Sequence, residues 1–290
     1  MNSFYLTLPS DSSMDIYPTN TQCCFKVKLP QKIQLDKDQW EVAIVEMIVP
    51  AQFANIDEND SYFDIISNNS LFNEDVAAIP KKTFKIAKIK DTTPKFQLRF
   101  KIPPGSYMTP EYLCDTINDT IQEGLGEVLS KRKQAIEIRY SNLSNRPKML
   151  FQHIKQIGLR LSSKMNILLG GDPDQNNTIF PNTKNPFPYN PNINVGSNQL
   201  FIYSDIVEYS VVGHIQAPIL RVVPFKTSNA HNNETGTQHI HQEYLNLHYI
   251  PIAKSEFETI HINIRGDTGK TIHFIGGKSM VKLHFRKHIN

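Results

Sequence analysis

The sequence is poor in the features of a disulfide-stapled or membrane-spanning protein. Its 290 residues include three cysteines, of which Cys23 and Cys24 are adjacent and Cys114 stands alone. They are too few for a disulfide framework and lack the spacing of a zinc site. No run approaches the roughly 20 apolar residues of a transmembrane helix, and the N-terminus lacks the basic and apolar segments of a signal peptide. We expect free thiols, no membrane partner and synthesis in the cytosol.

A strong charge of either sign is also missing. The 31 Lys and Arg residues nearly balance the 28 Asp and Glu residues, which gives a formal net charge of +3. The cations are spread along the chain, so a surface that follows a phosphate backbone is not indicated. The dense run Lys131-Arg132-Lys133 follows a predicted helix, where cations suit the negative end of the helix dipole. We therefore expect no specific nucleic-acid partner.

What the sequence does contain is a series of short β-like segments. They are rich in β-branched and aromatic residues, and clusters of Pro, Asn, Asp and Gly separate them. Many short strands with few helices are typical of an all-β, antiparallel sandwich or barrel. The predicted strands are 4–8, 24–29, 41–49, 62–66, 83–89, 96–102, 135–140, 148–153, 158–161, 200–204, 219–224, 257–264, 271–274 and 280–286.

Hydrophobic patterning distinguishes two kinds of strand. Apolar and polar residues alternate over 25–29 and over 96–100, which predicts one buried and one solvated face. Residues 42–49 are almost continuously apolar, as in a strand covered on both faces. We expect this strand to be central or to meet a neighbouring subunit.

One amphipathic helix and one long loop interrupt the strands. Thr109-Pro110-Glu111 is a helix start, and an apolar residue then recurs every four positions from Leu113 to Leu125, which predicts packing on this chain's own sheet. A short helix is predicted from Ser162 to Leu169, ended by Gly170-Gly171. Residues 172–198 are rich in Asn and Pro and have no period, so they are predicted to be a long loop.

The most tempting catalytic motif is His239-Ile240-His241. On a strand the two imidazoles would share a face, and Glu243 could complete a metal site of the cupin type. Glu243 follows the second His too closely for that motif, however, and no second half-motif lies downstream. We interpret the pair as solvated histidines, with a cupin-like metal enzyme as the least favoured alternative.

The glycine-rich segment Gly266–Thr271 resembles a phosphate-binding loop but lacks its first glycine. It lies between two predicted strands, so a hairpin turn explains both glycines. The tripeptide Arg265-Gly266-Asp267 on this turn is one that some adhesion ligands present to receptors, which leaves receptor binding as a weak alternative. No Gly-x-Ser-x-Gly motif or other nucleophile setting occurs. We expect no enzyme activity, catalytic residue, cofactor or metal.

Several segments, in the right order over almost the whole chain, resemble the penton (minor capsid) proteins of Polinton/Maverick elements, adintoviruses and virophages. The Asn- and Pro-rich stretch 172–198 has no counterpart in this resemblance. The residues that carry it are Phe4-Tyr5-Leu6-Thr7-Leu8-Pro9-Ser10, Ser13–Thr21, Trp40–Glu46, Gly105-Ser106-Tyr107, Ile117-Asn118, Leu161–Gly170, Leu200–Glu208, Val212-Gly213, Pro218–Pro224 and Leu283-His284-Phe285-Arg286.

The resemblance implies a jelly-roll capsid protein that forms homopentamers at the vertices of an icosahedral virion. Its partners would be further copies of itself and trimers of a double-jelly-roll major capsid protein. We expect one jelly-roll domain over 1–290, with a possible small inserted β subdomain near 60–95. A receptor- or glycan-binding jelly roll is the alternative, with a host-cell receptor as partner.

Three charged residues lie in apolar, strand-like context: Asp205, Glu208 and Arg221. We interpret them as ion-paired or rim residues that fix strand register. The alternative is that they pair across subunits.

Overall fold

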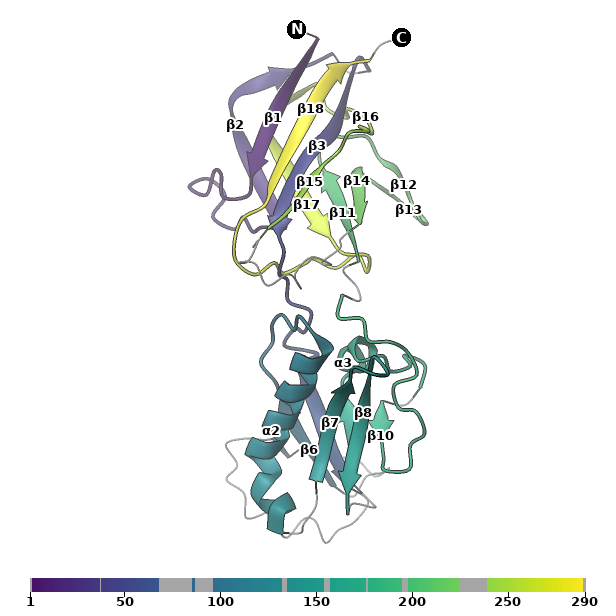
Figure 1. Ribbon diagram of the computed structural model, residues 1–290. Coiled ribbons are helices and arrows are strands. Elements are labelled where there is room, and N and C mark those ends of the chain that lie inside the picture. The colour runs from purple at the N-terminus through teal and green to yellow at the C-terminus, as the bar shows by residue number, and fades with distance from the viewer. Residues whose placement is uncertain are drawn as a thin grey trace. The chain divides into compact units, whose positions relative to one another are not determined.

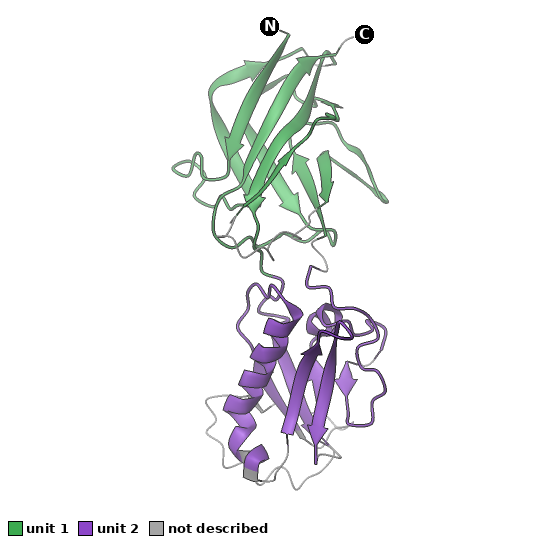
Figure 2. Cartoon of the chain, viewed as in Figure 1, with its two compact units in different colours: residues 1–54, 196–290 green, residues 55–195 purple. Residues whose placement is uncertain are grey.

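The computed structural model describes residues 2–36, 38–67, 85–86, 96–131, 135–153, 157–175, 177–194, 198–224 and 239–288. The chain divides into two compact units, one made of 1–54 and 196–290 and the other of 55–195 (Figure 2). The first unit is thus built from both ends of the sequence. We predicted one domain over 1–290 with a small insertion near 60–95. The chain instead divides into two units, and the inserted unit spans 55–195.

Unit 1 is a sandwich of two antiparallel sheets, as Figure 1 shows. Sheet A has the order β1-β18-β3-β15, with β16 also pairing with β3. Its strands are β1 (Ser3–Pro9), β3 (Trp40–Pro50), β15 (His239–Glu243), β16 (Ile250–Pro251) and β18 (Met280–Lys287). Strand β3 is central in this sheet, which confirms the prediction from its continuous apolar run.

Sheet B has the order β14-β11-β17-β2. Its strands are β2 (Cys24–Gln34), β11 (Gln199–Ser204), β14 (Ile219–Pro224) and β17 (Glu256–Arg265). Burial alternates along β2 and β17, so one face of each strand enters the core and the other faces outward. The core between the sheets is formed by both inner faces, and Phe25, Ile44, Ile262 and Phe285 are fully or almost fully buried in it. The prediction of an antiparallel jelly-roll sandwich is confirmed.

The excursion between β11 and β14 forms a separate hairpin of β12 (Ser210–Val212) and β13 (Ile215–Ala217). These strands were not predicted, because three-residue strands carry almost no periodicity. One predicted strand, 271–274, is wrong: Thr271 and Phe274 form only isolated bridges, to Arg265 and Phe53. Gly276 and Gly277, both with positive φ, follow this segment after Ile275 and end its extended path.

Among the described residues, unit 2 contains one sheet, a hairpin and the helices α2 and α3 (Figure 1). The sheet, here called sheet C, has the order β10-β9-β4-β6-β5. The elements are β4 (Tyr62–Ser67), β5 (Lys85–Ile86), β6 (Phe96–Lys101), α2 (Pro110–Lys131), β7 (Ala135–Ser141), β8 (Arg146–Gln152), β9 (Ile157–Leu161), α3 (Ser163–Leu168) and β10 (Thr178–Ile179). Of the predicted strand 83–89 only 85–86 lie within the described residues.

Helix α2 packs its apolar stripe on this unit's own core, as predicted. Leu113, Ile117, Ile121 and Leu125 are all buried there, and the Thr109 hydroxyl accepts the Tyr112 backbone N–H at the helix start. A Cβ at Gly124 would lie 2.3 Å from the Phe100 ring, so the glycine sets how closely helix and sheet approach. The helix reaches Lys131, and Arg132 and Lys133 of the basic run lie outside the described residues.

Strand β6 was predicted to have one solvated face, but its polar side chains are largely covered by the protein. Gln97 is buried, and Arg99 is only part-exposed because it pairs with the fully buried Asp64 of β4. The Asn- and Pro-rich loop is also less open than its composition suggests. It contains β10 and buries Phe187, and the carbonyl of Tyr189 would meet any Cβ at Gly170, the predicted stop of α3. No helix in the described ranges is long and apolar enough to span a bilayer.

Candidate functional site

The Arg265-Gly266-Asp267 tripeptide lies at the end of β17 and in the turn that follows. The Gly266 N–H donates to the Lys270 carbonyl, and the Gly269 N–H donates to the Gly266 carbonyl, which confirms a turn in place of a phosphate-binding loop. An Asp267 carboxylate oxygen lies within 3.3 Å of the Asn198 backbone nitrogen and 3.4 Å of its side-chain nitrogen. Both Arg265 and Asp267 are exposed, and receptor binding through this tripeptide stays a prediction.

The two histidines of the candidate metal motif lie on β15, and of the two, His241 has acidic neighbours among the described residues. Its Nε2 is 3.0 Å from Glu46 and 3.8 Å from Glu243. Glu46 also accepts from Lys282, whose ammonium group is 3.3 Å away and is the main cause of the lowered pKa of that carboxyl. The carboxylate nearest His241 is therefore already neutralised by a cation, which favours an ion-paired cluster on the outer face of sheet A over a metal site.

The thiols divide into two kinds. Burial raises the pKa of Cys23 and raises that of Cys114 to about 12, so both stay protonated at neutral pH. The Cys24 sulfur is 3.3 Å from Nε2 of His261, a contact that the sequence did not predict. Burial lowers the pKa of His261, and a neutral imidazole does not supply the positive charge that stabilises a thiolate.

The charged residues in apolar context have partners within the chain. Asp205 binds the Lys254 ammonium group at 2.6 Å and accepts the His261 backbone N–H at 2.8 Å. Arg221 lies 3.8 Å from the Tyr244 ring centroid, within reach of the Asn246 carbonyl. Both contacts tie strands of unit 1 to neighbouring segments. They support the interpretation of Asp205 and Arg221 as residues that fix strand register. For Glu208 the structure gives a backbone contact, in which its N–H donates to the Pro251 carbonyl.

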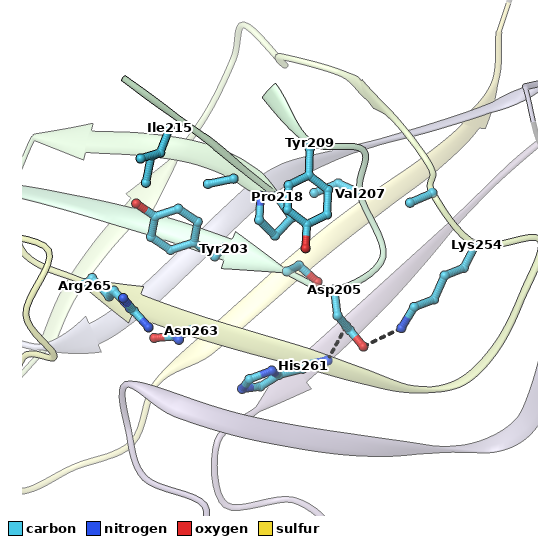
Figure 3. A pocket seen from close by; sticks show the side chains of 13 residues that line it. Tyr203, Asp205, Val207, Tyr209, Ile215, Pro218, Lys254, His261, Asn263 and Arg265 are labelled. Carbon is cyan, nitrogen blue, oxygen red and sulfur yellow. Dashed lines mark hydrogen bonds and ion pairs between the residues drawn. The ribbon is translucent and has the colours of Figure 1, made fainter. Parts of the chain in front are cut away.

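A pocket of about 590 Å³ lies at sheet B in unit 1 (Figure 3). Strands β11 and β17 line it on one side, and the segment that carries β12 and β13 lines it on the other. Figure 3 shows Tyr203 near Asn263 and Arg265, and Tyr209 beside Pro218 and Val207. A volume of this size lies within the range of small-ligand sites, roughly 300 to 1,000 Å³.

Within the part of the chain that the structure describes, two polar atoms of the pocket residues have no hydrogen-bonding partner. They are the Ser204 hydroxyl oxygen and the Asn263 side-chain oxygen, and both are shielded from solvent by the protein. The pocket also contains Arg265, which forms no ion pair among the described residues. Sequence reasoning missed the pocket because its residues come from separate strands. One sequence signal could have indicated part of the pocket: polar and apolar residues alternate along β17, which places His261, Asn263 and Arg265 on one face.

The hairpin beside the pocket carries unusually exposed apolar side chains. Tyr209 is 68% exposed, Val211 74% and Ile215 52%. Strands β12 and β13 pair only with each other among the described strands. Such exposed apolar groups on a projecting element mark a candidate contact surface.

Comparison with known proteins identifies the fold. No protein-family model and no curated protein matches the sequence. The mavirus penton protein, in its crystal structure, superimposes with a TM-score of 0.50 at 9% identity, over 99% of this chain and 100% of that one. A chain in the cryo-EM structure of the Sputnik virophage has a TM-score of 0.47 at 12% identity, over 99% of this chain and 98% of that one. The chain therefore has the fold of the mavirus penton protein over nearly its whole length.

Proposed function

We propose that this chain is a structural capsid protein that forms homopentamers at the vertices of an icosahedral virion. The observation that carries the proposal is the match to a penton protein over 99% of the chain, which includes both the jelly roll and the inserted unit. The proposed partners are other copies of the chain and trimers of a double-jelly-roll major capsid protein. The proposed location is the virion.

The described part of the molecule also favours a non-enzymatic role. His241 belongs to a cluster whose carboxylate is paired with Lys282, and Cys24 lies beside an imidazole that burial keeps neutral. Neither arrangement is that of a nucleophile activated by an oriented base. Elemental analysis that found a stoichiometric metal would contradict this view.

A closed ring requires each copy to contribute two different surfaces, because rotational contacts are heterologous. We propose that the β12–β13 hairpin is one of them. It presents Val211 and Ile215 to solvent, whereas most large apolar side chains of unit 1 are buried between its sheets. Burial of these side chains against the next copy would contribute roughly 1.5 to 3 kcal/mol for each fully covered residue.

Mass photometry of the purified chain, alone and with the major capsid protein, tests the ring. We expect a species of five chains, and we expect Val211→Glu to weaken it at least tenfold because a carboxylate would be buried at the contact. Leu245→Glu is the matched control, since Leu245 is 97% exposed in the segment between β15 and β16 and is not part of the hairpin. A wild-type chain that stays monomeric and never joins the shell would refute the proposal. A pentamer unaffected by Val211→Glu would refute only the hairpin.

A further inference from the structure

The hairpin of unit 2 leaves one strand edge open. Strand β8 pairs with β7 along its whole length, Arg146–Gln152, and among the described strands it pairs with no other. The N–H and C=O groups of a strand point alternately to its two sides, so every second residue of β8 directs them away from β7. None of these groups forms a backbone hydrogen bond to another described segment. Such an edge is a template for one more strand.

A groove of about 420 Å³ follows this edge. The consecutive residues Arg146–Phe151 of β8 all line it. Successive side chains of a strand point to opposite faces, so neighbours line one groove together only where it runs along the edge of the strand. Met149, opposite the buried Ile138, belongs to the inner face, and Lys148, opposite Arg139, belongs to the outer one. The groove therefore lies beside the open backbone edge and receives side chains from both faces.

The opposite wall of the groove is apolar and is held in place by the chain itself. It begins at Ile179 of β10, a strand that pairs only with β9 among the described strands (Figure 1). It continues through Phe180, Pro181 and Pro186. The Phe180 N–H donates to the Thr183 hydroxyl at 2.8 Å, and the Thr183 N–H donates to the Phe180 carbonyl at 2.9 Å. Phe180 and Pro186 are half-buried and Pro181 is exposed, so these side chains are open to a bound molecule.

The charge of the groove is positive. Arg146 and Lys148 line it, and no aspartate or glutamate is found among the described residues that do. Neither cation has an ion pair within the described part of the chain, and Arg146 donates to the Asn190 side-chain oxygen at 3.3 Å. By contrast, Arg139 on the adjacent strand is paired with Glu137 at 2.6 Å. Two cations without a counter-charge favour an acidic partner.

The same cations disfavour a second copy of this chain as the occupant. If the β8 edges of two copies paired, Arg146 and Lys148 of one would approach cations of the other, and like charges on paired strands are destabilising. Pro147 also lacks an N–H and removes one donor from the strand. Lysine and proline are residues by which natural proteins keep sheet edges from pairing with one another. An acidic strand meets no such repulsion, so the edge is selective and not closed.

We propose that this groove binds an extended acidic segment of a partner protein, which adds a strand to β8. Main-chain hydrogen bonds to β8 supply the affinity, and side chains at alternate positions supply the selectivity. Apolar side chains of the segment pack against Phe180, Pro181 and Pro186, and its carboxylates reach Arg146 and Lys148. All of these groups belong to unit 2, so the site goes beyond the proposed capsid role and does not depend on ring formation.

The first test pans a phage-displayed library of random linear peptides against the full chain. We expect the selected peptides to be enriched in Asp and Glu. Fluorescence anisotropy then measures the affinity of the best of them, and its binding should slow amide hydrogen exchange in Arg146–Gln152. Methyl groups on alternate backbone nitrogens of that peptide should weaken binding about tenfold in one of the two alternating sets and much less in the other, because only one set faces β8.

Charge variants separate the groove from general electrostatic attraction. Arg146→Glu/Lys148→Glu should weaken binding of the selected peptide about tenfold or more, because both carboxylates repel its acidic side chains. Lys101→Glu changes an exposed cation of unit 2 that does not line the groove, and it should leave binding unchanged. Thermal melting checks that each variant is folded. Lys148→Glu alone, at an exposed position, gives the same comparison should the double variant fail to fold.

Several outcomes would overturn the proposal. They are failure to select any peptide, selection of basic or neutral peptides, no protection of β8, equal effects of the two methylated sets, and binding that the charge reversals leave unchanged. Slower exchange of β8 in an assembled ring without peptide would assign the groove to a second copy and overturn it as well. A monomeric chain that binds the acidic peptide through β8 would support the proposal while refuting the pentamer.

Discussion

The guanidinium of Arg99 binds both carboxylate oxygens of Asp64, with N–O distances of 2.8 and 3.1 Å. Asp64 is fully buried at the centre of sheet C, while the Arg99 side chain keeps 39% of its surface exposed and covers the Tyr62 ring at 4.0 Å. The pair raises the pKa of Arg99 through its hydrogen bond to Asp64. The buried carboxylate of Asp64 is thus paired with a guanidinium that is partly exposed to solvent.

Removal of that partner should destabilise unit 2. In Arg99→Met the Asp64 carboxylate stays buried without a counter-charge, and we expect a loss of about 3 kcal/mol. The double variant Asp64→Leu/Arg99→Met should recover much of it, because no charge remains buried. Urea unfolding, with hydrogen exchange of residues 55–195 as the readout, measures the stability loss in both variants. Equal destabilisation of the single and double variants would contradict this account.

Two glycines of α2 should respond oppositely to alanine. Gly124→Ala places a methyl group 2.3 Å from the buried Phe100 ring, and overpacking of this kind costs about 1 to 3 kcal/mol. At Gly126 a Cβ meets only the end of the flexible Gln122 side chain. Gly126→Ala should therefore be neutral or stabilise by up to about 1 kcal/mol, through helix propensity. Thermal melts of the two variants compare them directly, and similar values would argue against the close approach at Gly124.

Asn118 joins α2 to β7 through its amide group. Its nitrogen donates to the Ile138 carbonyl at 2.8 Å, and its oxygen accepts the Ile138 N–H at 2.9 Å. Asn118→Leu removes both bonds and leaves two backbone groups unpaired, at an expected cost of about 2 to 4 kcal/mol. Asn142→Leu, at an exposed turn position, is the control and should change stability by less than about 0.5 kcal/mol. Chemical denaturation measures both variants.

Unit 1 should lose stability in mild acid. Burial lowers the folded-state pKa of His284, and it lowers that of His261 as well, from an ordinary value of 6.5. Between the ordinary and the lowered pKa the unfolded chain binds more protons than the folded one, so stability falls as pH drops below about 6.5. His284 Nδ1 also lies 2.7 Å from the Tyr249 hydroxyl.

Melting temperatures between pH 7.5 and 5 test this dependence. We expect them to fall with pH, and the fall should be smaller in His284→Gln, which removes one of the two groups. His214→Gln, at an exposed hairpin position, should leave the slope unchanged. A slope that is identical in wild type and His284→Gln would exclude His284 as a contributor.

Local patterns predicted the elements that depend on near neighbours in the chain. Period-two alternation located β2 and β6, the continuous apolar run identified β3 as central, and the Thr109-Pro110 start with its stripe predicted α2. These signals are strong because burial of one face dictates which residues occupy it. The strand predicted at 271–274 failed, because pairing with distant segments decides whether an extended segment joins a sheet.

The sequence by itself determined an antiparallel β-rich chain with one amphipathic helix and no recognisable catalytic motif. Tertiary structure alone decided that two units share the chain, that Asp64 meets Arg99, and that Tyr203, Ser204, Asn263 and Arg265 surround one pocket. Those groups come from strands about 60 residues apart, as the Tyr203 and Asn263 pairing shows. Side-chain periodicity states which face a residue occupies, but only strand pairing states which residues share that face.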